Sequence, residues 1–161
     1  MSSLEILKKC AEEIRNEILP LVGTKEAAKT YGRGAGGDLT KEIDLRAEKA
    51  LIRKIKEAEL SCTILSEEKG IIELGAFPKS LYLICDPLDG TTNALHGVPF
   101  MATSIALAKG PFLSQIEAAV VMDLIHGIIY AAEKGKGAYR NDEKISPSQE
   151  TDLENSVIGI D

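Results

Sequence analysis

A short apolar run at residues 81–85 leads directly into an acidic, glycine-containing segment, and this junction restricts the fold more than any other feature. The segment reads Asp86-Pro87-Leu88-Asp89-Gly90-Thr91-Thr92-Asn93. An apolar run of this length that ends in acidic residues predicts a buried strand whose carboxylates reach an edge of a sheet. Asp86 and Asp89 can then turn towards one point, with the Leu88 carbonyl between them. Three hard oxygen ligands suit Mg²⁺, so the segment predicts a metal site.

The second half of the same segment predicts a place for an anion. Gly90 permits a close backbone approach, and residues 91–93 can begin a helix whose free N–H groups face a negatively charged group. Metal ligands and a phosphate site are therefore expected side by side. The plain alternative is an aspartate-rich turn after a strand, which is common for Asp-Gly alone but does not account for the whole string.

Two further acidic groups are candidates for the same site. Glu67 and Glu68 follow a second short apolar run, at residues 62–65, and can add a metal ligand and a group that orients water. Taken alone, such a pair is usually solvated surface. Residues 38–40 with the nearby Asp44 fit either the site or an ordinary helix start, because Asp and Thr favour the first turn of a helix. Both interpretations of Asp44 stay open on the residues alone.

Two familiar patterns are set aside. Gly32, Gly34 and Gly37 satisfy the spacing GxGxxG, but a polar segment precedes them where a dinucleotide site needs a strand, so a flexible loop is expected instead. Phosphatases of the haloacid dehalogenase type use DxDGT, in which the first aspartate attacks phosphorus. Here Pro87 stands two residues before Asp89, so that nucleophile is missing. The spacing favours a metal-activated water over a phosphoenzyme.

Composition excludes several classes of function. The formal net charge is −6 and aromatic residues make up 4%, so the chain lacks the basic track and stacking platforms of nucleic-acid binding. No apolar stretch reaches the ~20 residues of a membrane helix, and no basic-then-apolar leader begins the chain. The prediction is a cytoplasmic protein without nucleic-acid or membrane partners. Cys10, Cys62 and Cys85 are odd in number and widely spaced, which predicts reduced, mostly buried thiols.

Apolar spacing predicts one domain over residues 1–161. Helices are expected at 3–19, with Ser3 as the cap, and at about 40–58, with a loop at 23–38 between them. Strands are expected at residues 62–65, 81–85, 103–108, 116–122 and 128–132. The last three of these are expected to form an antiparallel meander. A polar connection is expected between the first two strands. Residues 157–161 look like the beginning of another strand, so the chain is expected to stop inside a larger fold.

Taken together, four strings resemble the inositol monophosphatase family, within the lithium-sensitive phosphatase superfamily. They are GDLTKEIDLRAE, ILSEE, DPLDGTTNALHGVPF and EKGKGAYRND. The first two look especially like the archaeal members that act on both inositol monophosphate and fructose 1,6-bisphosphate. The resemblance implies an α/β (α+β) phosphatase fold of the fructose-1,6-bisphosphatase/inositol monophosphatase type. The first domain of that fold has two helices packed on a largely antiparallel sheet.

The resemblance also implies a role for each candidate residue. Glu67 would ligate metal on the attacking side, Asp86 would bridge two metals, and the Leu88 carbonyl and Asp89 would each bind one of them. Asp89 and the backbone N–H groups of Gly90 and Thr91 would bind the substrate and its phosphate. The cofactor would be two or three Mg²⁺ ions, with Mn²⁺ as an alternative.

Three catalytic roles and one structural role follow in the same way. Asp44 would accept the hydroxyl proton of Thr91, and Glu68 would help to place the attacking water. The loop around residues 34–38 would close over the site and help to position a third metal. His96 is interpreted as structural, a neutral cap of a short helix.

The implied function is Mg²⁺-dependent hydrolysis of inositol monophosphate, fructose 1,6-bisphosphate or both. Alternatives are a 3′-phosphoadenosine 5′-phosphate phosphatase and a non-catalytic metal- or phosphate-binding fragment. The resemblance implies a second αβ domain that supplies another aspartate to the second metal and most substrate contacts, and this domain is expected to be absent from the 161 residues. The 161-residue chain alone is therefore expected to be an impaired enzyme, and the full-length protein a homodimer.

Overall fold

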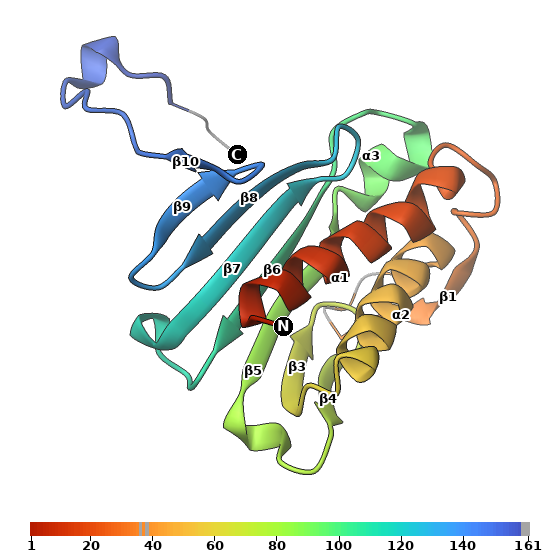
Figure 1. Cartoon of the computed structure of the whole chain (residues 1–161). Coiled ribbons are helices and arrows are strands. Elements are labelled where there is room, and N and C mark those ends of the chain that lie inside the picture. Colours follow the sequence, from red (N-terminus) through yellow and green to blue (C-terminus); the bar gives the residue numbers. More distant parts are fainter. Residues whose placement is uncertain (36, 38, 159–161) are drawn as a thin grey trace.

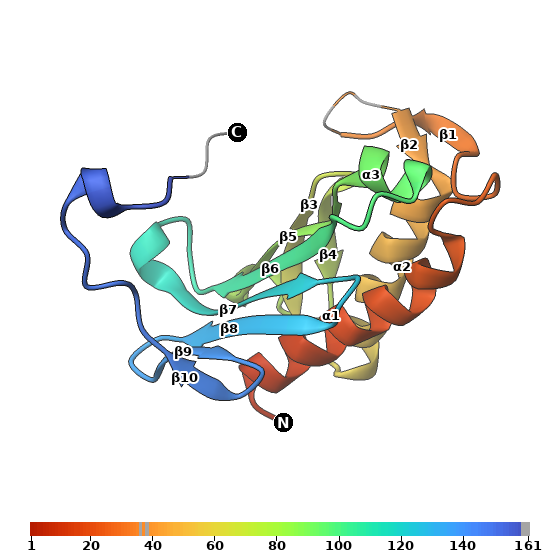
Figure 2. The same cartoon turned by 90° about the horizontal axis from the view of Figure 1, so that it is seen from above.

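Two long helices cover one face of an eight-stranded sheet (Figure 1). The structure is a computed structural model and describes residues 1–35, 37 and 39–158. The long helices are α1 (Ser3–Ile18) and α2 (Glu42–Glu57), and Figure 2 shows both on the same side of the sheet. The strands of the sheet are β3 (Cys62–Ser66), β4 (Gly70–Leu74), β5 (Tyr82–Asp89), β6 (Ala102–Ala108), β7 (Ile116–Asp123), β8 (Ile128–Glu133), β9 (Gly137–Arg140) and β10 (Glu143–Ile145).

The sheet is antiparallel except at one pair of strands. Its order is β10-β9-β8-β7-β6-β5-β3-β4, so β6, β7 and β8 form the predicted meander, which β5 extends on one side and β9 and β10 extend on the other. Strands β3 and β5 run parallel to each other, and β4 folds back beside β3 as a hairpin at the sheet edge. The expectation of two helices on a largely antiparallel sheet is confirmed.

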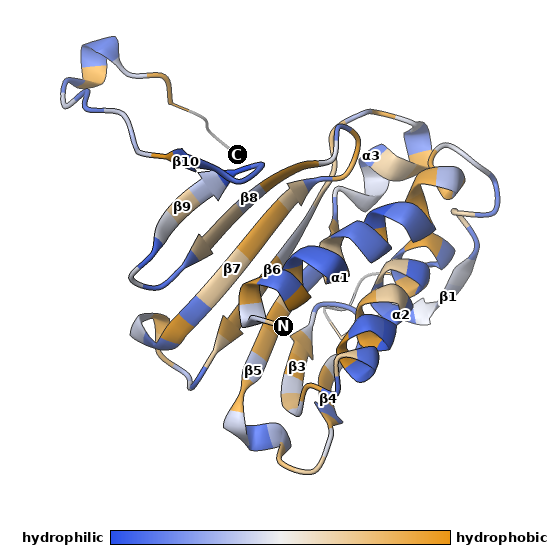
Figure 3. Cartoon of the chain, in the orientation of Figure 1, coloured by the Kyte–Doolittle hydropathy of each residue, from blue (hydrophilic) through white to orange (hydrophobic). Residues whose placement is uncertain are grey.

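The helices form where the apolar spacing predicted them. In α1 the fully buried residues Leu7, Ala11 and Ile14 recur every three or four positions, which places them on one face. The cap is Ser2 and not Ser3: the Ser2 hydroxyl accepts from the backbone of Glu5, and the Glu5 carboxylate accepts from the backbone of Ser2. Figure 3 shows polar residues along the outward sides of both helices.

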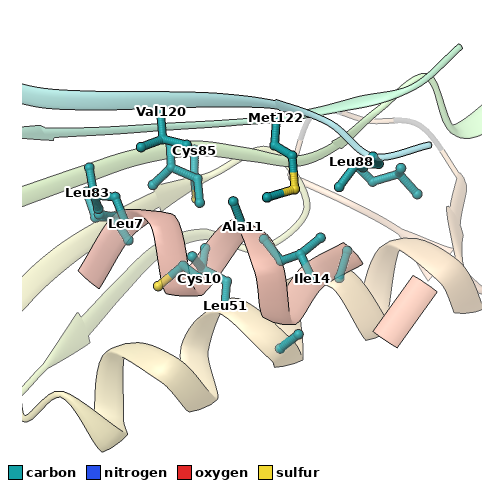
Figure 4. Close-up of a cluster of buried hydrophobic side chains, with 14 of the residues drawn as sticks. Leu7, Cys10, Ala11, Ile14, Leu51, Leu83, Cys85, Leu88, Val120 and Met122 are labelled. Atoms are coloured by element: carbon teal, nitrogen blue, oxygen red, sulfur yellow. The ribbon is translucent and has the colours of Figure 1, made fainter. Parts of the chain in front are cut away.

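The core lies between these helices and the sheet. Figure 4 shows Leu7, Ala11 and Ile14 of α1 facing the sheet residues Leu83, Cys85, Val120 and Met122, with Leu51 of α2 beside them. Cys10, Cys62 and Cys85 are free and buried, as predicted, and burial raises the pKa of the Cys85 thiol to about 12. Such a thiol stays protonated and behaves as a small apolar side chain.

The core allows a first prediction. Replacing Leu51, which is fully buried, with alanine should lower the free energy of unfolding by about 2–5 kcal/mol, because the lost methyl groups leave a cavity. Ile71 is the matched control, since its side chain is 73% exposed on an edge strand. Urea denaturation of Leu51→Ala and Ile71→Ala checks this, and equal losses in the two variants would contradict the placement of the core.

Two further local predictions were wrong. The polar connection expected after residue 65 contains strand β4, because β3 offers an edge with which residues 70–74 can pair. The loop expected at 23–38 contains β1 (Thr30–Arg33), which pairs with β2 (Leu39–Lys41) as an antiparallel hairpin. The strand start expected at 157–161 falls mostly on residues 159–161, which lie outside the described residues; residues 157 and 158 are not in a strand.

Within the residues that the structure describes, no helix is both long enough and apolar enough to cross a membrane.

Candidate metal and phosphate site

The candidate residues meet because strands β3 and β5 run in the same direction. Ser66 at the end of β3 pairs in register with Cys85 of β5, so the next residues, Glu67 and Asp86, emerge at the same edge of the sheet. A shallow hollow of about 300 Å³ lies there. It is lined by Glu67, Asp86, Leu88, Asp89, Gly90, Thr91, Thr92 and Asn93.

The end of β5 is irregular, and this irregularity directs its carboxylates. Asp86 pairs with Ser104 of β6 and Asp89 pairs with Ala102, so β5 has one residue more than β6 over this interval. Such a bulge re-aims the side chains around it. The backbone N–H of Leu88 donates to Oδ1 of Asp86 at 3.1 Å, which closes a tight local turn. The motif was expected after the strand, but β5 continues through Asp89.

The carboxylates of this hollow repel one another. The pKa of Asp86 is raised to about 6, first by burial and then by the negative charges of Glu67 and Asp89. Across the described ranges, no lysine, arginine or histidine forms an ion pair with any of these three side chains. This part of the chain therefore leaves their charge without a cationic partner.

The donor set fits a hard cation. In the part of the chain that the structure describes, no three His, Cys, Asp or Glu side chains already stand close enough together to enclose a metal ion. Mg²⁺ does not need such a cage, because it usually binds through one or two carboxylates and keeps several waters. The pair Glu67 and Asp86, together with the Leu88 carbonyl, is such a set, and Asp89 lines the same hollow.

Gly90 makes the turn into the short helix α3 (Thr91–His96). Its φ is +96°, a left-handed conformation, and a Cβ there would lie 3.0 Å from the Phe100 carbonyl oxygen. The first N–H groups of α3 have no acceptor within the helix, and its first residues line the hollow. At the other end of α3, Nδ1 of His96 lies 2.8 Å from the Thr92 carbonyl oxygen, in keeping with the structural role expected for this histidine.

Asp44 and Thr91 are joined by a hydrogen bond. The Thr91 hydroxyl donates to Oδ1 of Asp44 at 2.7 Å and also lies 3.3 Å from the Leu88 carbonyl oxygen. The other oxygen of Asp44 accepts from the backbone N–H of Lys41 at 2.9 Å, at the start of α2. One carboxylate oxygen of Asp44 thus contacts Thr91 of the hollow, and the other contacts the start of α2. Burial of Asp44 raises its pKa, against the lowering effect of these two hydrogen bonds.

Glu68 lies apart from the hollow. Its carboxylate accepts from the Thr40 hydroxyl at 2.6 Å, and its carbonyl accepts from the backbone N–H of Ala35 at 2.7 Å. Burial raises the pKa of Glu68. Glu68 therefore fastens the loop of the β1–β2 hairpin to the turn after β3. The expected third-metal loop includes residues 36 and 38, which lie outside the described residues.

Sequence interpretation did not single out Glu48. It is fully buried in α2, one turn after Asp44, and its carboxylate accepts from the Ser66 hydroxyl at 2.6 Å. The signal was present in the sequence, because a glutamate stands there beside the apolar stripe of Ala47 and Leu51.

Comparison with known proteins gives one family. The family profile described as the inositol monophosphatase family matches residues 3–160. A fructose-1,6-bisphosphatase/inositol-1-monophosphatase of Methanothermobacter thermautotrophicus is 35% identical over 158 residues, which cover 92% of this chain and 56% of that protein. A bifunctional NADP phosphatase/NAD kinase of Methanococcus maripaludis is 33% identical over 177 residues, covering 99% of this chain and 31% of that protein.

The fold agrees with this result. A crystal structure described as an inositol monophosphatase–fructose 1,6-bisphosphatase superposes with a TM-score of 0.79 at 32% identity, covering 96% of this chain and 64% of the other. The chain spans about half the length of the first of these relatives and about a third of the second.

Proposed function

The chain belongs to the inositol monophosphatase family, and from this premise we propose that the protein containing it is a Mg²⁺-dependent phosphate monoester hydrolase. Its proposed substrates are inositol monophosphate, fructose 1,6-bisphosphate or both, in line with the name of the Methanothermobacter relative. One observation carries the proposal. Glu67, Asp86 and Asp89 share a hollow with the first residues of α3, so uncompensated carboxylates lie next to backbone N–H groups that suit a phosphate.

The metal would be held by this chain's own oxygens. Glu67, Asp86, the Leu88 carbonyl and Asp89 are the proposed ligands of two or three Mg²⁺ ions, with Mn²⁺ as an alternative. When bound, these ions supply Lewis acidity that makes water acidic and offsets the charge of the phosphate and of the leaving alkoxide. The backbone N–H groups of Gly90 and Thr91 would bind and orient the phosphate.

Thr91 and Asp44 are proposed to align the attacking water. The Thr91 hydroxyl has one proton and donates it to Asp44, so its lone pairs are left to accept a hydrogen bond from water in the hollow. A proton passed to Thr91 can then move on to Asp44, whose raised pKa suits it to hold one. Glu68 would act from outside the hollow, by fixing the turn and the hairpin loop.

A substrate profile tests the proposed function. Phosphate release should be measured with and without Mg²⁺, on the longest native polypeptide that contains this chain. The substrates are inositol monophosphate, fructose 1,6-bisphosphate, 3′-phosphoadenosine 5′-phosphate and NADP. The fourth is included because one relative is named an NADP phosphatase. Preference for either nucleotide would replace the proposed substrates, and Mg²⁺ binding without any release would favour a non-catalytic module.

The 161-residue chain by itself should bind Mg²⁺ but release phosphate slowly. It spans 56% of the Methanothermobacter relative, and the family resemblance assigns a further metal ligand and most substrate contacts to a second domain. Loss of that ligand weakens one ion and with it the stabilisation of the leaving group. Calorimetric Mg²⁺ titration and a phosphate-release assay on the same sample check both parts. Rapid Mg²⁺-dependent turnover by this polypeptide would contradict the expectation.

That the full-length protein is a homodimer, and that it is located in the cytoplasm, both remain predictions.

A further inference from the structure

A buried carboxylate lies directly behind the turn that carries Glu67. Glu48 in α2 is fully buried, its Oε1 accepts from the Ser66 hydroxyl at 2.6 Å, and its Oε2 lies 2.9 Å from Nζ of Lys69. A charge taken out of water is costly unless it is paired and hydrogen-bonded. Glu48 therefore holds its two partners strongly, since each of them offsets that cost.

The two partners stand on either side of the Glu67-Glu68 pair. Ser66 is the last residue of β3, and Lys69 is the last residue of the three-residue turn that leads into β4. Glu48 thus fixes the turn at both ends. The Glu68 carboxylate between them accepts a hydrogen bond from the Thr40 hydroxyl of β2 at 2.6 Å.

Glu67 itself has little else to orient it. Its side chain is exposed, and over the described residues its carboxylate forms no ion pair; its hydrogen-bonding contact is with the Asp86 carboxyl, which can donate only when it is protonated. Its neighbour across the hollow is the Asp86 carboxyl, whose charge repels it when both are ionised. The direction of Glu67 is therefore decided by the backbone of the turn.

The helix α2 serves both sides of the hollow. Asp44 and Glu48 are four residues apart and lie on one face of the helix. Asp44 holds Thr91, and Glu48 holds the two ends of the turn of Glu67. The Oε2 atom of Glu48 receives no well-aligned hydrogen bond within the described residues, so its ion pair with Lys69 is what balances its charge.

We propose that Glu48 is a positioning residue for the metal site: through Ser66 and Lys69 it holds the turn so that Glu67 faces Asp86. The inference rests on the proposed function, because it concerns the same site. Replacing a residue that orients a metal ligand without itself binding the metal typically lowers metal affinity or activity by about 10–100-fold.

The test compares three variants. Glu48→Gln keeps the size of the side chain but removes the charge that pairs with Lys69, and Ser66→Ala removes the other contact. Glu57→Gln is the matched control, because Glu57 is also a glutamate of α2 paired with a lysine, Lys54 at 2.8 Å, but it lies at the end of the helix away from the hollow. Mg²⁺ binding is measured by titration calorimetry on the 161-residue chain, and folding by circular dichroism. The Mg²⁺ concentration for half-maximal phosphate release is measured on the longest native polypeptide.

The expected result is about tenfold or greater weakening of Mg²⁺ binding in Glu48→Gln and Ser66→Ala, with Glu57→Gln unchanged. The activity at saturating Mg²⁺ should largely return, which a general loss of structure would not permit. Folded variants with wild-type Mg²⁺ affinity would overturn the inference, and Ser66→Ala decides the matter if Glu48→Gln does not fold. Failure of the proposed function is seen separately, because the wild-type native polypeptide would then release no phosphate at any Mg²⁺ concentration.

Discussion

Replacing Asp86 with asparagine should abolish Mg²⁺ binding while making the metal-free chain more stable at neutral pH. The variant loses a carboxylate from the hollow, so phosphate release by the native polypeptide should fall by about three orders of magnitude or more, the rate equivalent of the several kcal/mol that a bound cation supplies. The gain in stability follows from the same crowding of carboxylates that makes the site attractive to a cation.

The sign of the stability change comes from the pKa of Asp86. Its ordinary value is 3.8, and burial with the nearby charges of Glu67 and Asp89 raises it to about 6. A group with a raised pKa in the folded state contributes stability that is fully present below the unfolded value and is lost as the pH rises through the folded value. The metal-free wild type should therefore lose stability between about pH 4 and pH 7. Asp86→Asn should escape this loss, worth about 1–2 kcal/mol after allowance for the partial exposure of the group.

Urea denaturation in the presence of a chelator, at acidic and at neutral pH, measures this difference. Asp142→Asn is the control, because Asp142 is exposed in the turn before β10, far along the sheet from the hollow. Added Mg²⁺ should stabilise the wild type and the control but not Asp86→Asn, since only a folded state that binds the ion gains from it. A variant that still binds Mg²⁺ tightly, or that shows the same pH dependence as the wild type, would remove Asp86 from the proposed ligands.

Replacing Asp44 with asparagine should lower kcat by about 10²–10⁴, the usual value of positioned proton transfer, with little change in Mg²⁺ affinity. Asp44 does not line the hollow, so it has no direct contact to lose there. Its two oxygens accept from the Thr91 hydroxyl and from the Lys41 backbone N–H. An amide has one acceptor oxygen and a donor NH₂ group, so the asparagine side chain cannot serve both donors.

The second contact of Asp44 makes a control necessary. Loss of the bond to Lys41 weakens the start of α2 and should cost about 0.5–2 kcal/mol of stability, independently of catalysis. Thr91→Val removes the hydroxyl and leaves that helix start intact, while Thr91→Ser keeps the hydroxyl. Steady-state kinetics on the native polypeptide should show Thr91→Val impaired like Asp44→Asn, and Thr91→Ser close to the wild type. If Thr91→Val keeps a normal kcat, Asp44 is only a helix-start residue.

The sequence by itself determined the features that depend on neighbouring residues. Apolar residues at helical spacing placed α1 and α2, because one face of a helix is decided within a few turns. The string from Asp86 to Asn93 determined that two carboxylates and a glycine come directly before a short helix. The meander from β6 to β8 was likewise readable from short apolar runs separated by turns.

Only the tertiary structure decided which distant segments meet. Glu67 lies beside Asp86 because β3 and β5 pair in parallel, and Thr91 reaches Asp44 across 47 residues because α2 packs behind the site. The tertiary structure likewise decided that Glu48 contacts Ser66 next to Glu67, that Glu68 accepts from Thr40 of the β1–β2 hairpin, and that β4 pairs with β3. Local periodicity reports which face of an element is buried, but not its partner. The partner is selected by how all the apolar faces can be buried together, and that is a property of the whole packed chain.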